Sequence, residues 1–149
     1  MLQIRPQRFF AKHVEFGVLE ELELGLDGTD LALSVEAVKS KESESSVIIH
    51  LQLRTIVNDG MGIRVHYCAE FEVADSENSE YKVTDDTLRD TFMQVNAPAI
   101  AYPYLRSFVS IICVNAGQDP TILPPVNFQA LFNKRKSDKK IDEPIRIAQ

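Results

Sequence analysis

The sequence lacks the features that would place this chain in a membrane or outside the cell. None of its apolar runs approaches the ~18 to 20 uninterrupted residues that a membrane-spanning helix needs. Its opening residues, MLQIRPQRFF, lack the basic, apolar and small-residue succession of a signal peptide. Only two cysteines are present, and without an export signal they are expected to be reduced thiols. The sequence therefore predicts a cytoplasmic protein without membrane insertion.

The sequence is equally poor in the residue patterns of enzymes and metal centres. It has no phosphate-binding glycine-rich loop, because the glycines of DGMG at residues 59–62 lack the required spacing. His66 and Cys68 share one face of a predicted strand, but a structural zinc needs four ligands. The remaining candidates lie on other segments: His13, His50 and Cys113. We predict no enzymatic activity, no cofactor and no metal site.

Basic residues are scarce in most of the chain and concentrated at its end. Residues 1–133 hold 10 Lys and Arg against 19 Asp and Glu, whereas residues 134–149 hold 6 against 3. Because phosphate binding needs clustered Lys and Arg, the acidic body argues against nucleic acid as a partner. It suits cationic or unfolded polypeptides better. We expect one folded domain over residues 1–133 and a basic, disordered tail over residues 134–149.

Four segments have the period-two alternation of β-strands. They are residues 7–18, 30–38, 46–57 and 63–73. In the last of these, apolar side chains from Ile63 to Val73 fall on one face, and charged or polar side chains fall on the other. The sequence NDGMG at residues 58–62 is typical of a hairpin connection. This spacing predicts an antiparallel meander rather than alternating β-α-β units.

The periodicity changes to that of a helix in the last third of the chain. Apolar residues recur at intervals of three and four from Ala101 to Ile112, with Pro103 expected in the first helical turn and Gly117 as the stop. Asn127 is the expected N-cap of a short helix over residues 128–136. The predicted class is α+β: a four-stranded antiparallel sheet, with a long helix and a short C-terminal helix packed on one face.

Three motifs in the last third and the first strand carry a resemblance to a known family. APAIAYPYLRSFVSII at residues 97–112 contains Pro103-Tyr104-Leu105-Arg106, and LPPVNFQALF at residues 123–132 contains Pro-Val-Asn-Phe followed by Ala-Leu-Phe. QRFFAKHVEF at residues 7–16 adds a Gln-Arg, aromatic, Lys and Phe pattern. Over about residues 3 to 133 the sequence therefore resembles the SecB family of protein-export chaperones.

The resemblance implies a SecB-like fold assembled as a homo-tetramer, a dimer of dimers. It also implies an ATP-independent holdase that binds unfolded or precursor polypeptides in exposed hydrophobic grooves for protein export. Ordinary core packing is the competing interpretation for each groove residue. The groove residues that the resemblance implies are Leu31, Leu33, Val35, Val126, Phe128, Leu131 and Phe132.

The sequence departs from the family on the sheet surface with which family members meet the SecA motor. Two first-strand positions that are acidic in the family are here His13 and Gly17. In the fourth strand a matching acid remains as Glu70, with Cys68 near it where an aliphatic residue is typical. Because loss of carboxylates weakens docking of a positive partner, we expect a divergent member with reduced or absent SecA coupling.

Three other functions stay open on the sequence. One is a SecB-like chaperone dedicated to a single client, such as the antitoxin of a toxin–antitoxin pair. Another is a small-ligand-binding α+β domain, which predicts one enclosed pocket with convergent polar groups rather than open grooves. The third is a structural subunit whose apolar surface is fully consumed by oligomerisation.

Overall fold

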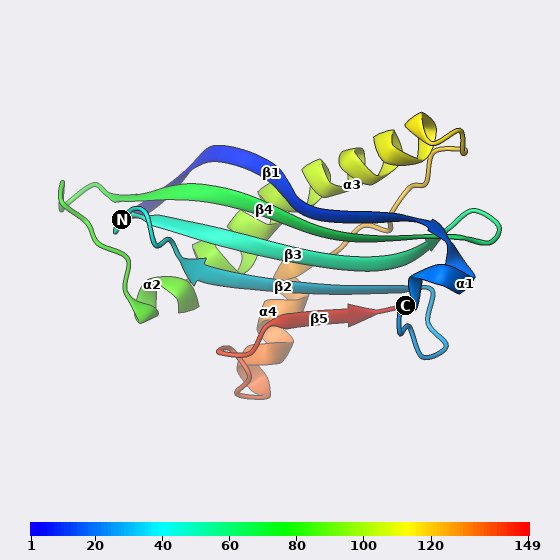
Figure 1. Cartoon of the computed structure of the whole chain (residues 1–149). Coiled ribbons are helices and arrows are strands. Elements are labelled where there is room, and N and C mark those ends of the chain that lie inside the picture. Colours follow the sequence, from blue (N-terminus) through cyan, green and yellow to red (C-terminus); the bar gives the residue numbers. More distant parts are fainter.

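The computed structural model describes residues 1–149 and contains one five-stranded antiparallel sheet (Figure 1). The strands lie in the order β1-β4-β3-β2-β5, so that β1 and β5 are the edges. The four predicted strands are present, and the fifth is an addition to the prediction. Their bounds are β1 (Leu2–Val18), β2 (Leu31–Lys39), β3 (Ser46–Val57), β4 (Met61–Asp75) and β5 (Ile145–Ala148).

The hairpin between β3 and β4 forms where the sequence predicted it. Val57 pairs with Met61, and Asn58 and Gly60 take the left-handed backbone conformation that the tight connection requires, with φ of 54° and 75°. The hairpin sets the register of the two central strands, so alternate residues of both strands share a face. His50 lies opposite Cys68 as a result.

The first strand does not join the meander, and on this point the prediction was wrong. β1 pairs with β4 instead of β2, because the residues after it carry the chain past the end of the sheet through the short helix α1 (Leu19–Leu22). Leucines of this connection pack on Gly62, where an added Cβ would lie only 2.9 Å from a methyl carbon of Leu24. Glycine at position 62 therefore permits the connection to close on β4.

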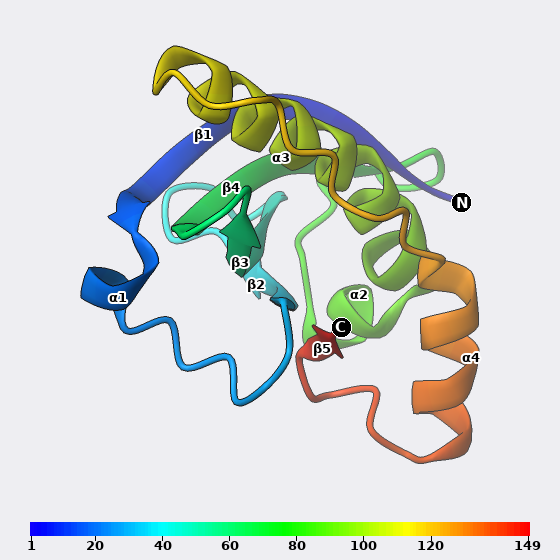
Figure 2. The ribbon, with the colours of Figure 1, turned by 90° about the vertical axis from the view of Figure 1, so that its right-hand side faces the viewer.

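The helices cover one face of the sheet, as Figure 2 shows for α3 and α4. A single π-helical turn η1 leads directly into α3, and α4 follows the proline-rich segment. Together with the inward side chains of β2, β3 and β4, these helices enclose one hydrophobic core that includes Phe71, Leu105 and Phe128. The bounds are α2 (Asp85–Arg89), η1 (Phe92–Asn96), α3 (Ala97–Asn115) and α4 (Phe128–Ser137).

The ends of the two main helices follow the predicted signals, with one exception. The Asn127 side chain accepts a hydrogen bond from the Ala130 amide at 3.0 Å, which confirms the cap, and Gly117 beyond α3 has φ of 79°. Pro103, however, lies inside α3 rather than in its first turn. The helix begins at Ala97, four residues before the start of the predicted apolar stripe. Both Pro103 and Ala99 are exposed, so water can satisfy the carbonyl that Pro103 leaves unpaired.

One helical segment passes the length and composition test for a membrane span. It is Phe92–Asn115, and it is the one such helix in the chain. The sequence prediction was based on uninterrupted apolar runs. It did not include this segment, because polar residues such as Gln94 and Arg106 interrupt it. The core helix of a soluble protein passes the same test. Here Ala101, Leu105 and Val109 are buried in the core beneath the sheet-facing side of α3.

The last sixteen residues contain regular structure, contrary to the expected disorder. The boundary predicted at residue 133 falls inside α4, and β5 pairs antiparallel with β2 from Val35–Ile145 to Ala32–Ala148. Ile145 is 2% exposed and belongs to the main core. The expected disorder followed from the net charge of this segment. The alternation of IRIA, with isoleucine side chains on one face of β5 and Arg146 and Ala148 exposed on the other, is the signal of a strand.

Candidate functional site

The predicted groove residues of β2 lie in the core of this chain. Leu31, Leu33 and Val35 are 5%, 2% and 2% exposed. Their side chains point toward the helices, and the outer edge of their strand is covered by β5. In the single chain these three residues stabilise the fold, and Leu33 and Val35 each also line part of a surface pocket.

The Pro-Val-Asn-Phe motif borders a shallow, mainly apolar surface hollow. Val126 and Phe128 line it from the start of α4, and Val95 and Ala99 line it from η1 and α3. The Phe128 ring itself is buried edge-on against Tyr102, whose hydroxyl donates a 2.6 Å hydrogen bond to the Pro124 carbonyl. This hydrogen bond holds the motif against α3. The structure thus brings two of the predicted groove residues together at one surface site.

The remaining two predicted residues, on α4, lie apart from this hollow. Phe132 is buried, at 8% exposure, and Leu131 is half-buried and faces the C-terminal segment near Ile145. The seven predicted residues therefore do not form one continuous surface. β2 contributes core, Val126 lines a surface hollow beside the buried ring of Phe128, and Leu131 contributes a contact with the tail.

Sequence reasoning missed most of the apolar side chains that are exposed. Ile122, in the proline-rich segment, is 82% exposed, and Tyr104, Ile111 and Val114 on α3 are each about half exposed. A second hollow between α3 and this segment is lined by Pro103, Ile122 and Leu123. The sequence did contain a sign of these exposed residues: the apolar stripe of α3 is wider than a single buried face requires. We call Ile122 with the hollow at Val126 and Phe128 the crossover surface.

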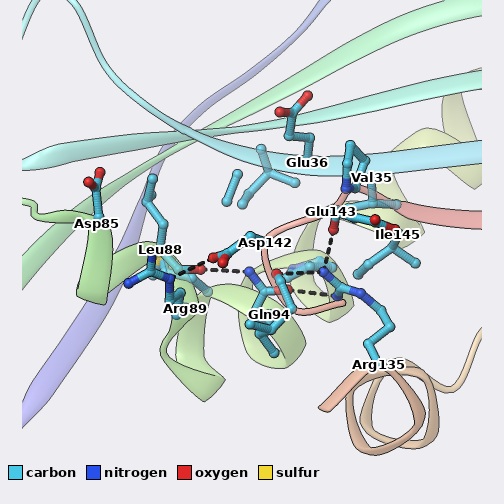
Figure 3. Close-up of a pocket in the computed structure, with 16 residues that line it drawn as sticks. Val35, Glu36, Asp85, Leu88, Arg89, Gln94, Arg135, Asp142, Glu143 and Ile145 are labelled. Atoms are coloured by element: carbon cyan, nitrogen blue, oxygen red, sulfur yellow. Dashed lines mark hydrogen bonds and ion pairs between the residues drawn. The ribbon is translucent and has the colours of Figure 1, made fainter. Parts of the chain in front are cut away.

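The pocket beside the C-terminal segment is closed by its own polar residues (Figure 3). Arg135 of α4 points toward the tail and donates hydrogen bonds to the Gln94 side chain at 2.7 Å and to the Ile141 carbonyl at 2.9 Å. Arg89 donates to Asp142 at 2.6 Å. Burial lowers the pKa of the Arg135 guanidinium, so its hydrogen bonds offset a real desolvation cost. These contacts fix the tail in the position from which β5 pairs with β2.

We expect Arg135→Met to loosen β5 and to lower the free energy of unfolding by about 2 kcal/mol, because a charged hydrogen-bond donor is lost and the buried Gln94 oxygen is left without a partner. Hydrogen exchange followed by mass spectrometry should show faster exchange of the β5 amides. Arg146→Met is the matched control, since Arg146 is exposed. Equal protection of β5 in both variants would contradict this role of Arg135.

The pocket beside the C-terminal segment is also a candidate for the small-ligand site that the sequence left open. Its volume is about 230 Å³, below the roughly 300 to 1,000 Å³ of typical ligand sites. Its polar groups, Arg89, Gln94, Arg135 and Asp142, bind one another or the tail backbone instead of converging on free space. The pocket is better explained as the attachment of the tail than as a ligand site.

The face of the sheet away from the helices is open, and the predicted docking residues lie on it or at its end. His13, Cys68 and Glu70 are on this face, and Gly17 pairs with Gly62 near the end of β1. Glu70, the remaining acid, forms an ion pair with Arg8, whose Nε lies 2.8 Å from Glu70 Oε2. His13 contacts Glu15, and this contact together with Arg64 lowers the pKa of the Glu15 carboxyl. The acids of this face are therefore largely paired within the chain.

His66 and Cys68, which were expected to share one face of a strand, meet His50 of the neighbouring strand on this open face. His50 Nδ1 lies 2.8 Å from His66 Nε2 and 3.6 Å from Cys68 Sγ. Burial lowers the pKa of both imidazoles and raises the pKa of the Cys68 thiol. This cluster could have been inferred from the hairpin register, because the predicted turn places His50 opposite Cys68. Cys113 lies on α3 in the core, on the other side of the sheet.

Taken together, the fold and its surfaces define a small α+β protein of one sheet and two covering helices. It offers shallow apolar hollows near α3 and α4, and a hollow of about 590 Å³ on the open polar face of the sheet. These are features of a protein that contacts other polypeptides over a broad surface.

The chain belongs to the SecB family, since residues 18–139 match the family described as preprotein translocase subunit SecB. This confirms the family predicted from the motifs, and membership agrees with the prediction that the chain is not an enzyme. It also agrees with the predicted α+β class, with one strand more than expected.

Several proteins named protein-export protein SecB are similar to this chain. The Burkholderia vietnamiensis protein is 27% identical over 114 residues, which cover 76% of this chain and 68% of the relative. The Anaplasma phagocytophilum protein is 20% identical over 123 residues, covering 79% and 75%. The Nitrosomonas eutropha protein is 38% identical over 50 residues, and this match spans only 31% of that protein's length.

A solved structure has the same fold. It is a SecB-like chaperone of Mycobacterium tuberculosis in complex with a ChAD peptide from the HigA1 antitoxin. The TM-score is 0.61 at 14% identity, and the superposition covers 83% of this chain and 88% of the other.

Proposed function

We propose that this protein is an ATP-independent chaperone, a holdase that binds unfolded or precursor polypeptides. The observation that carries the proposal is the crossover surface on a chain of the SecB family: Ile122 is 82% exposed, and a mainly apolar hollow lies at Val126 and Phe128 in the same proline-rich crossover. Exposed apolar hollows on a monomer often mark sites where other polypeptides bind. Family membership and the free cysteines Cys68 and Cys113 support a cytoplasmic location.

The physical basis of binding is the apolar surface that only unfolded chains present. Full burial of a side chain such as Val or Ile is worth about 1.5 to 3 kcal/mol. Shallow hollows gain a fraction of this at each contact, so several contacts along an extended client are needed to reach the roughly 8 kcal/mol of a micromolar complex. Such binding tolerates many sequences, because no single contact dominates.

We also propose the family's homo-tetramer, a dimer of dimers. β1 is an edge strand of 17 residues that exposes Val14 and Val18, and α3 exposes Ile111 and Val114. A long unprotected edge with apolar side chains pairs readily with another chain. In this arrangement α3 and β1 serve subunit contacts, and the crossover surface remains for clients.

A binding experiment that compares two states of one client tests the chaperone proposal. A protein trapped in its unfolded form by reduction and alkylation is titrated with the purified chaperone, without nucleotide, and complexes are counted by native mass spectrometry. We expect a complex with the unfolded form and none with the same protein in its native form. Equal binding of both forms, or of neither, would contradict a holdase.

A chaperone dedicated to one client is the second candidate. The observation in its favour is that the Mycobacterium tuberculosis protein with this fold carries a peptide from an antitoxin. A dedicated chaperone would bind one cognate polypeptide far more tightly than unrelated unfolded proteins, whereas a general one would bind them within a narrow range of affinities. Competition between client peptides in the same titration distinguishes the two.

We expect SecA to bind this protein with an affinity weaker than micromolar even at low salt. Glu70 is already paired with Arg8, and His13 and Gly17 replace two residues that are acidic in the family. Restoring the acids tests the cause. Nothing lies within 4 Å of a Cβ built at Gly17, so His13→Asp with Gly17→Glu should fold and raise the affinity for SecA at least about tenfold. Micromolar binding by the unaltered protein at low salt would refute the expectation.

A further inference from the structure

His50, His66 and Cys68 form a compact cluster on the open face of the sheet, at a distance from the crossover surface. His50 comes from β3, and His66 and Cys68 come from successive outward positions of β4. One nitrogen of each imidazole and the Cys68 sulfur all lie within 4.8 Å of one another. The paired central strands hold the three Cα positions, so this arrangement is set by the register of the sheet.

One observed separation equals that of a tetrahedral metal centre, and the other is shorter by about 0.5 Å. With metal–nitrogen and metal–sulfur bonds of about 2.05 and 2.3 Å, a tetrahedral ion places nitrogen and sulfur about 3.6 Å apart and two nitrogens about 3.3 Å apart. The observed distance from Cys68 Sγ to His50 Nδ1 is 3.6 Å, and that from His50 Nδ1 to His66 Nε2 is 2.8 Å. Small rotations of the two rings would open the space for an ion without movement of the strands.

The local chemistry also suits metal ligation. The two imidazoles hydrogen-bond to each other and so share one proton, which leaves lone pairs on neutral rings. Burial raises the pKa of the Cys68 thiol, and the positive charges of Lys12 and Arg8 act in the opposite direction. Glu36 lies opposite His50 in the pairing of β2 with β3. When an ion binds, the thiol proton leaves as H⁺, and the proton between the two rings moves to the other nitrogen of its own ring, so that both imidazoles ligate as neutral groups. Both histidines are half-buried and partly reached by solvent, whereas Cys68 is fully buried.

We propose that His50, His66 and Cys68 bind one thiophilic divalent metal ion of the zinc type. Two imidazoles and one thiolate are ligands of borderline-soft ions and select against Mg²⁺ and Ca²⁺. His13 lies opposite His66 across β1 and β4, but its Nε2 is held by Glu15 at 2.8 Å. Water or a side chain of a partner therefore completes the coordination. The site is independent of the holdase proposal.

Titration with Co²⁺ as the probe tests the site, because a cobalt–thiolate bond gives a charge-transfer absorption in the near ultraviolet. The full-length protein is reduced with a phosphine and stripped of metal first. We expect one Co²⁺ per chain, displacement by Zn²⁺, and no effect of excess Mg²⁺. Cys68→Ser should abolish the absorption, and Cys113→Ser, the matched control, should retain it.

His50→Gln and His66→Gln provide a second readout that does not depend on the buried cysteine. Each should weaken Co²⁺ binding at least about tenfold while the far-ultraviolet circular dichroism stays that of the unaltered protein. Absence of the thiolate band in the unaltered protein would overturn the proposal. So would a band that persists in Cys68→Ser, or binding that is unchanged in both histidine variants.

Discussion

Replacing Phe71 with alanine is expected to lower the free energy of unfolding by about 3 to 5 kcal/mol. Phe71 is fully buried at the centre of β4 and meets the ring of Phe9 edge-on, with ring centroids 6.2 Å apart. Removing it leaves a cavity under α3 that the paired central strands cannot collapse to fill. Urea denaturation at one fixed protein concentration measures the effect, because an oligomer's stability depends on concentration.

Phe10→Ala is the matched control on the opposite face of the sheet. Phe10 is half-buried on the open face, where the guanidinium of Arg8 lies 4.6 Å from its ring centroid. Loss of this contact should cost about 1 kcal/mol. Similar losses for Phe10→Ala and Phe71→Ala would mean that both faces of the sheet are covered, which would contradict an open sheet face.

The double substitution Ile122→Asp with Val126→Asp is expected to weaken binding of unfolded polypeptides at least about tenfold. Each carboxylate must be desolvated when an apolar client segment covers the crossover surface, and each lost apolar contact removes part of about 1.5 to 3 kcal/mol. Fluorescence anisotropy of a labelled unfolded client measures the change. Because Ile122 is 82% exposed, its substitution should leave the stability of the chain almost unchanged.

A control with the same added charge separates the site from general electrostatics. Thr91→Asp with Asn115→Asp adds two carboxylates at exposed polar positions outside the crossover surface. It should leave client affinity within about twofold of the unaltered protein, since exposed charges are screened by salt. If both double variants lost affinity alike, net charge would explain the binding and the crossover surface would not.

Local patterns predicted the elements of this fold well. The bounds expected for β3 agree with the structure, and Asn127 and the hairpin at residues 58–62 behave as their chemistry requires. These features depend on neighbouring residues, so they can be inferred from a short stretch of sequence. The motifs around residues 97–132 identified the family as well.

Long-range features were predicted poorly, and the reason is physical. The pairing of β1 with β4 depends on where the chain is carried after β1, and the pairing of β5 with β2 depends on Arg135 and its contacts with the tail. Neither is visible in local periodicity. An apolar residue in a strand also gives no sign of whether a groove or a core will contain it, and Leu33 proved to be core.

The candidate sites also differ in how far local sequence could predict them. Val126 and Phe128 could be placed because one motif contains both, whereas Ile122 stands in an irregular segment without periodicity. The cluster of His50, His66 and Cys68 was accessible in principle from the hairpin register. It was missed because the ligands were considered strand by strand instead of as cross-strand neighbours.

The central proposal, that this chain holds unfolded polypeptides without ATP, is tested most directly by aggregation suppression. Light scattering is recorded as a chemically unfolded protein is diluted into buffer without nucleotide, with and without this protein, whose native mass is measured in parallel. We predict suppression that is complete near one tetramer per client. Undiminished scattering in the presence of a well-folded tetramer would contradict the proposal and would leave a protein whose apolar surface serves assembly alone.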